Sequence, residues 1–116
     1  MPLLLLALAV DPAAPMPAPP PRPHGAPLAS YISSADYPAE AIRRGEQGDV
    51  GVTIQVSPQG RVATCTVTRS SGSAILDATT CRLLTPRVRF IPARDAAGRP
   101  TTDIVVGRIR WMLPPR

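Results

Sequence analysis

The side chains of this 116-residue chain that could do chemistry are few and scattered. His24 is the only histidine, and it lies among prolines beside Gly25, without the partners that a metal site or a catalytic pair requires. The sequence contains no serine, histidine and acid set, no phosphate-binding glycine loop and no cluster with metal-ligand spacing. We therefore expect a protein that is not an enzyme and that needs neither a cofactor nor a metal.

Two cysteines, Cys65 and Cys81, allow at most one internal disulfide. In a reducing compartment they would instead be two small buried hydrophobic residues. The number of cysteines does not decide between these alternatives.

Arginine supplies all thirteen basic side chains, and against eight acidic residues it gives a formal net charge of +5. A charge of this sign can indicate binding to nucleic acid or to an anionic membrane surface. However, only Arg43 and Arg44 are adjacent, most other arginines alternate with apolar residues, and the aromatic residues form no stacking platform. The distribution argues against a nucleic-acid partner.

The chain begins with two segments of low complexity. Residues 1–10 are apolar but shorter than the ~20 residues that span a bilayer, so they are either a short signal peptide or the end of a hydrophobic segment that begins upstream. Residues 11–32 hold eight prolines, from Pro12 to Pro27, and we expect a disordered polyproline II tether that reaches ~50 Å. The folded domain is expected over residues 33–116.

The first element expected in that domain is a short helix over residues 39–44. Its cap would be Asp36 or Tyr37. If Tyr37 is the cap, Glu40 lies at the third helical position and can reach back to the Tyr37 N–H. Ala41 and Ile42 would face the core.

Alternating apolar residues predict a hairpin of two strands, over residues 50–56 and 61–69, joined by a turn at 57–60. The face of the second strand that points to the core would carry Ala63, Cys65 and Val67.

A second helix is expected over residues 74–84, with Ser73 as its cap and Pro86 as its end. The last strand, over residues 101–113, would place Val105, Gly107, Ile109, Trp111 and Leu113 on one face. The predicted fold class is therefore α+β, with two helices packed on one face of a small three-stranded antiparallel sheet.

Six short motifs occur in order along this domain. They are Tyr37-Pro38, Gly48-x-Val50, Ser57-Pro58-x-Gly60, Ser70-Ser71-Gly72, Leu76-Asp77 and Arg89-Phe90-x-Pro92-Ala93. Each is weak alone, but their order and spacing resemble the C-terminal domain of the TonB energy-transducer family. The resemblance covers residues 37–113.

The resemblance implies a periplasmic interaction domain whose last strand pairs with a short extended peptide of a TonB-dependent outer-membrane transporter. Family members use this pairing in the import of iron chelates or cobalamin, driven by the proton-motive force. The implied contact residues are Ile104, Val105, Val106, Gly107, Arg108, Ile109 and Arg110. Residues 30–37 match a family stretch before the first helix that also contacts transporters. Without the resemblance, the strand would be read as a plain sheet edge that outward arginines protect from aggregation.

Many similar family members carry a cysteine pair like Cys65 and Cys81, and export would permit its oxidation. The resemblance therefore implies a disulfide between these two residues.

A full energy transducer also has an inner-membrane helix that meets the ExbB/ExbD motor, and residues 1–10 are too short to be that helix as written. Three functions stay open: a TonB-type transducer whose anchor lies upstream, an exported TonB-like binding module without energy transduction, and a basic protein that binds nucleic acid or the envelope. The sequence also leaves open whether the domain is a monomer or a homodimer that pairs its own last strands.

Overall fold

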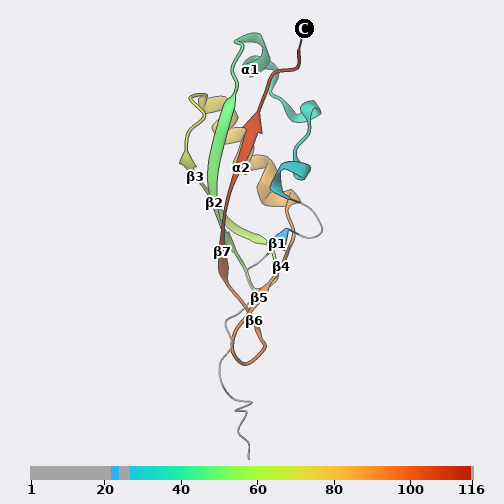
Figure 1. Ribbon diagram of the computed structural model, residues 1–116, viewed down its shortest axis with the longest axis vertical. Coiled ribbons are helices and arrows are strands. Elements are labelled where there is room, and N and C mark those ends of the chain that lie inside the picture. The colour runs from blue at the N-terminus through green and yellow to red at the C-terminus, as the bar shows by residue number, and fades with distance from the viewer. Residues whose placement is uncertain (1–21, 24–26, 116) are drawn as a thin grey trace, which may run out of the picture.

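The computed structural model describes residues 22–23 and 27–115. Figure 1 shows the elements along the chain. Their bounds are β1 (Arg22–Pro23), the 3-10 helices η1 (Leu28–Tyr31) and η2 (Ser34–Asp36), α1 (Ala39–Arg43), β2 (Gly48–Val56), β3 (Val62–Arg69), α2 (Ala74–Arg87), β4 (Phe90–Ile91), β5 (Ala93–Arg94), β6 (Pro100–Thr101) and β7 (Asp103–Trp111).

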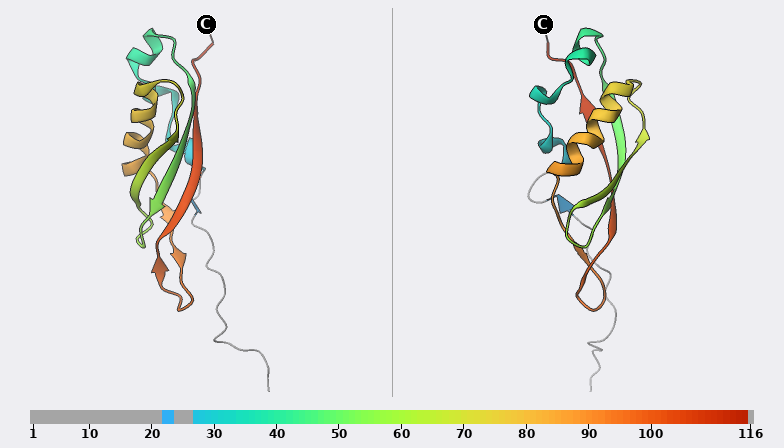
Figure 2. Two further views of the ribbon diagram at one scale, coloured as in Figure 1. Left: turned by 90° about the vertical axis from the view of Figure 1, so that its left-hand side faces the viewer. Right: turned by 180° about the vertical axis from the view of Figure 1, so that it is seen from behind.

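The main sheet has three antiparallel strands in the order β3-β2-β7. The central strand β2 alternates between the two faces, and its inward residues are fully buried: Val50, Val52, Ile54 and Val56. Figure 2 shows α1 and α2 on the same side of this sheet, with the other face bare of helices. The prediction of an α+β fold with two helices and an antiparallel sheet is confirmed.

One predicted core position on β3 is wrong, because the strand contains a β-bulge. Gln55 pairs with Thr64 and Val56 pairs with Val62, so Ala63 has no partner on β2. An extra residue reverses the alternation of side chains beyond it. Ala63 is therefore exposed and Val62 takes the buried place. The other residues predicted for this face are half-buried: Cys65 and Val67.

The first helix begins where the sequence predicts, but two details of that prediction are wrong. Glu40 does not bond to Tyr37; it forms an exposed ion pair with Arg44 (2.7 Å). The capping box lies earlier in the chain. It is formed by Ser33, which precedes η2, and Asp36, the last residue of η2. Ala41 is fully buried, but Ile42 is 47% exposed. A helix of five residues has room for one residue on its buried side, and Ala41 takes that position.

The second helix continues past Pro86 to Arg87, so the expected end at the proline is wrong. Proline inside a helix removes one backbone bond, but contacts beyond it hold the last turn. The N–H of Val88 donates to the carbonyl of Leu84 (3.0 Å), and Val88 is fully buried. The predicted cap is confirmed, since the Ser73 hydroxyl accepts from the N–H of Leu76 (3.2 Å).

Parts of the segment expected to be a disordered tether have defined structure. Residues 22–23 pair with β4, and η1 places Leu28 on the inner side of β7, where its side chain is buried. A Cβ at Gly107 would lie 2.5 Å from Leu28 Cδ1, so the glycine leaves room for it. The rest of the expected tether, and residues 1–10, lie outside the described residues. Within the described ranges, no helix is both long enough and apolar enough to cross a membrane.

The turn between β2 and β3 depends on Gly60. Its φ of +79° suits glycine, and its carbonyl accepts from the N–H of Phe90 (2.8 Å). A Cβ at this position would lie 2.2 Å from the Phe90 carbonyl oxygen. Glycine is therefore required at position 60 both by its φ angle and by the close approach of the Phe90 backbone. The bond between Gly60 and Phe90 joins the hairpin to the region of β4, β5 and β6, whose short two-stranded ladders the sequence did not predict.

Candidate binding edge of the sheet

Strand β7 lies at one edge of the main sheet. It pairs along its whole length with β2, from Asp103 opposite Val56 to Trp111 opposite Gly48. No described strand pairs with its other side, as Figure 1 shows. The sheet therefore ends in a nine-residue strand with a free row of backbone groups.

The hydrogen bonds show which backbone groups form that free row. The Ser57 N–H donates to the carbonyl of Arg61, the residue just before β3 (2.9 Å). The preceding residue, Val56, therefore directs its own groups toward β7, opposite Asp103. In an antiparallel pair such residues alternate. The residues directed toward β2 are then Val105, Gly107 and Ile109, and those directed away are Ile104, Val106, Arg108 and Arg110. Consistently, the Ile104 N–H donates to the carboxylate of Asp103 (2.7 Å).

The side chains of β7 alternate in the same register. The residues predicted to face inward are buried or half-buried, with Ile109 and Trp111 the most buried. The outward side chains are exposed, including Val106 at 74% and Ile104 at 58%. The residues that carry the free backbone groups are thus also the ones whose side chains lie on the bare face of the sheet.

The bare face carries a hollow of about 560 Å³ beside the edge. Arg69 of β3 and Arg108 of β7 lie opposite Gly51 of β2 on either side, so no side chain fills the space between them. Asp49 forms ion pairs with Arg108 (3.7 Å) and Arg110 (3.5 Å). The hollow therefore has more positive than negative charge at its walls.

A second, smaller cavity of about 220 Å³ lies on the inner side of the same edge, between β7 and the segment 29–37. Most of its walls are apolar, from Ala29, Ile32, Tyr37, Ile109 and Trp111, and Ser33, Ser34 and Arg110 also border it. The two sides of the β7 edge thus have different chemistry.

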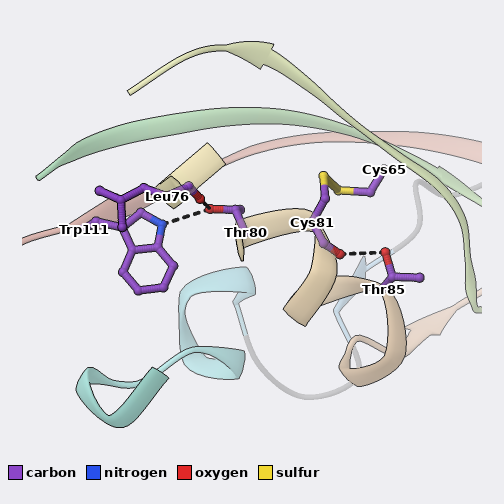
Figure 3. Close-up of a disulfide and its surroundings, with 6 residues drawn as sticks. All are labelled: Cys65, Leu76, Thr80, Cys81, Thr85 and Trp111. Atoms are coloured by element: carbon purple, nitrogen blue, oxygen red, sulfur yellow. Dashed lines mark hydrogen bonds between the residues drawn. A yellow bond between two sulfur atoms is a disulfide. The ribbon is translucent and has the colours of Figure 1, made fainter. Parts of the chain in front are cut away.

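The end of β7 is fixed by Trp111. Its indole N–H donates to the Thr80 hydroxyl (2.8 Å), which donates in turn to the Leu76 carbonyl (2.7 Å), as drawn in Figure 3. The Tyr37 ring meets the Trp111 ring edge-on at 5.2 Å. The Tyr37 hydroxyl donates to the Glu46 carbonyl, and burial, with the charge of Glu46, raises the pKa of Tyr37. The sequence placed Trp111 on the inward face of the last strand but did not indicate Thr80 as its partner.

Comparison with known proteins agrees with this architecture. The model of the family described as Gram-negative bacterial TonB protein C-terminal matches residues 33–113. The chain belongs to this family. The solution NMR structure of the Pseudomonas aeruginosa TonB CTD is similar, with a TM-score of 0.60 at 21% identity over 83% of this chain and 89% of that one. At this identity the likeness shows a shared fold. No curated protein matches the chain in sequence.

In this TonB C-terminal domain the disulfide joins Cys65 of β3 to Cys81 of α2, with 5.6 Å between their Cα atoms. Figure 3 shows the bond between the sheet and the helix. It is the pairing that the resemblance implied. Because β3 is the opposite edge of the sheet from β7, the disulfide holds the scaffold and does not touch the free edge.

Two carboxylates fix loops of the domain. Asp77 accepts hydrogen bonds from the Ser70 hydroxyl and from the N–H (2.9 Å) and hydroxyl (2.7 Å) of Ser71. Burial acts to raise the pKa of Asp77, but these bonds outweigh it and the pKa is lowered. Asp36 forms a bidentate pair with Arg87 (2.8 and 2.9 Å). The hydrogen bond from Arg87, with that from the Ser33 N–H, lowers the pKa of Asp36 well below its usual range.

Asp36 holds the segment that lies beside the β7 edge. Arg87 also donates to the Tyr31 carbonyl (2.9 Å), so one guanidinium links the end of α2 to both η1 and η2. The bonds from Ser70 and Ser71 to Asp77 join the family motifs at residues 70–72 and 76–77, which explains the spacing of these motifs.

In the part of the chain that the structure describes, no group of three or more His, Cys, Asp or Glu side chains could hold a metal.

Proposed function

We propose that this domain binds an extended peptide of a TonB-dependent outer-membrane transporter by adding it as a strand to β7. The observation that carries the proposal is the row of outward backbone groups at Ile104, Val106, Arg108 and Arg110, which none of the described strands satisfies. A peptide in extended form offers the matching N–H and C=O groups. Such pairing needs no catalytic side chain, and the domain is an interaction module in this proposal, not an enzyme.

Family membership supports the setting of the proposal. TonB C-terminal domains are periplasmic in Gram-negative bacteria, and in this proposal the transporter peptide reaches the domain in the periplasm. The wider role is the import of iron chelates or cobalamin, driven through ExbB/ExbD by way of an inner-membrane anchor. Co-purification of the full chain with ExbB/ExbD from membranes tests that wider role, and its failure would leave a binding module without energy transduction.

The pairing itself is tested by NMR titration of the ¹⁵N-labelled protein with a peptide from a transporter's N-terminal segment. The amide signals of Ile104, Val106, Arg108 and Arg110 should shift together. No shift at millimolar peptide would refute edge pairing.

A proline variant sharpens the test. Val106→Pro removes an N–H that points away from β2, and proline is tolerated at such edge positions, so the sheet should persist. Binding should weaken about tenfold or more, because one hydrogen bond of about 1 kcal/mol is lost and the ring obstructs the added strand. Val106→Ala, which keeps the N–H, is the matched control. Equal affinity of the two variants would show that the peptide does not pair with this edge.

A homodimer that pairs two β7 strands is distinguished in the same experiment. It would shift the same amide signals as the protein concentration rises, without peptide.

A further inference from the structure

A strand added to β7 would meet two different surfaces. Successive side chains of a strand point to opposite faces of the sheet. One set would therefore lie on the bare outer face beside Arg108 and Arg110, and the other set would point inward to the small cavity beside Ile109 and Trp111. The chemistry of these two surfaces constrains the sequence of the bound peptide.

The outer surface favours negative charge. A single carboxylate, Asp49, is shared by Arg108 and Arg110 at 3.7 and 3.5 Å, and these arginine side chains remain 72% and 70% exposed. Across Gly51, Arg69 has no acidic group within 4.0 Å among the described residues. Three guanidinium groups thus face one carboxylate around the hollow, and further acidic groups would be attracted to it.

The spacing of the arginines suits a strand. Arg108 and Arg110 are two residues apart on β7, which is about 6.6–6.8 Å. Alternate side chains of an added strand have the same repeat, and directly opposite Cβ atoms lie about 4.5–5.5 Å apart. Each arginine can therefore meet one acidic side chain of the peptide without any rearrangement of the backbone.

The inner surface favours apolar side chains. The cavity of about 220 Å³ lies between Ile109 and Trp111 of β7 and the segment that carries Ile32 and Tyr37. Ser33, Ser34 and Arg110 also border it, but most of its lining is apolar. Ile109, Trp111 and Tyr37 are already buried, so a charged group placed here would lose its hydration. An aliphatic side chain would extend the core.

We infer that the peptide bound at β7 alternates between acidic residues on the outer face and apolar residues on the inner face. The inference rests on the proposed function, since it describes the occupant of the same edge. A second copy of this chain does not suit the site, because the outward positions of its β7 hold two arginines and no acid. The occupant is therefore a peptide of another protein.

The test compares two six-residue peptides of the same composition by fluorescence anisotropy with the intact protein. One alternates Glu and Val, and the other has three Glu followed by three Val. The alternating peptide should bind about tenfold tighter, and the difference should shrink at high salt. Equal binding of the two peptides would overturn the inference.

Charge reversal gives an independent check. The double variant Arg108→Glu/Arg110→Glu should lose the preference for the Glu peptide and bind an alternating Lys and Val peptide instead. Arg43→Glu/Arg99→Glu is the matched control, because both residues are exposed and lie away from the edge, while the net charge changes equally. If the control behaves like the edge variant, only the total charge of the protein matters and the inference fails.

These outcomes separate the two proposals. If a transporter peptide shifts the β7 amides but the alternating and block peptides bind equally, the proposed function stands and the alternation is wrong. If neither transporter segments nor designed peptides shift those amides, edge pairing itself fails.

Discussion

Replacing Thr80 with valine should destabilise the fold because it removes the partner of a buried indole. Thr80 is fully buried and Trp111 is 3% exposed, so water cannot replace the lost hydroxyl. Valine has nearly the same shape, and no cavity of note is created. The unpaired Trp111 N–H then keeps its full desolvation cost, which is about 1–3 kcal/mol.

The same helix offers a matched control. The Thr85 hydroxyl donates to the Cys81 carbonyl at 2.7 Å, the same distance as the bond from Thr80 to Leu76. Figure 3 shows both bonds, at successive places along α2. Thr85 is exposed, and its hydroxyl accepts from no buried donor among the described residues. Thr85→Val should therefore change the free energy of unfolding by less than about 0.5 kcal/mol.

The measurement is urea denaturation followed by far-UV circular dichroism, which does not depend on Trp111 as a reporter. Trp111→Phe removes the N–H, so in that background Thr80→Val should cost much less, with a coupling energy on the order of 1–2 kcal/mol. Two results would refute the reasoning: equal losses for Thr80→Val and Thr85→Val, or an unchanged cost of Thr80→Val when the indole is absent.

Three further predictions concern the scaffold. Gly60→Ala should destabilise the fold more than Gly98→Ala, by about 1–3 kcal/mol. Both glycines have φ near +80°, but only a Cβ at Gly60 would meet a carbonyl oxygen, that of Phe90 at 2.2 Å. Equal shifts of the melting temperature for the two variants would contradict this. Serine at both Cys65 and Cys81 should lower the free energy of unfolding by roughly 3 kcal/mol, and reductant should bring the unaltered protein to the same urea midpoint; a midpoint that neither change moves would show that the bond contributes nothing. For Asp36, the folded pKa is lowered below the ordinary 3.8, so the folded state binds fewer protons and its stabilisation is present above that pH and lost as the pH falls below it. In the Asp36→Asn variant, the free energy of unfolding should therefore fall less steeply as the pH is lowered below about 4. The same pH dependence below pH 4 in the variant and the unaltered protein would argue against this.

Some features of the binding edge could be read from local sequence alone. The alternation along β7 separates exposed residues such as Val106 from buried ones such as Ile109, because the two-residue repeat of a strand is a property of the backbone. Which of the backbone groups of β7 are free could not be read in this way. That follows from the register of β7 on β2 together with the bond between Ser57 and Arg61, which shows that the backbone groups of Val56 point toward β7.

The sequence by itself determined the order of the two α-helices and the three strands of the main sheet, the alternation along β2, the cap at Ser73 and, through short motifs, the family. These depend on residues close together in the chain. The tertiary structure decided the features that depend on distant contacts: the bulge at Ala63, the helix that continues past Pro86, and the packing of Leu28 against Gly107. The bulge depends on pairing with β2, the last turn of α2 on the burial of Val88 and the bonds from Arg87 to the segment before α1, and the place of Leu28 on its contact with β7. The chemistry of the β7 edge arises in the same way, because its arginines and its apolar cavity come from separate parts of the chain and meet only after folding.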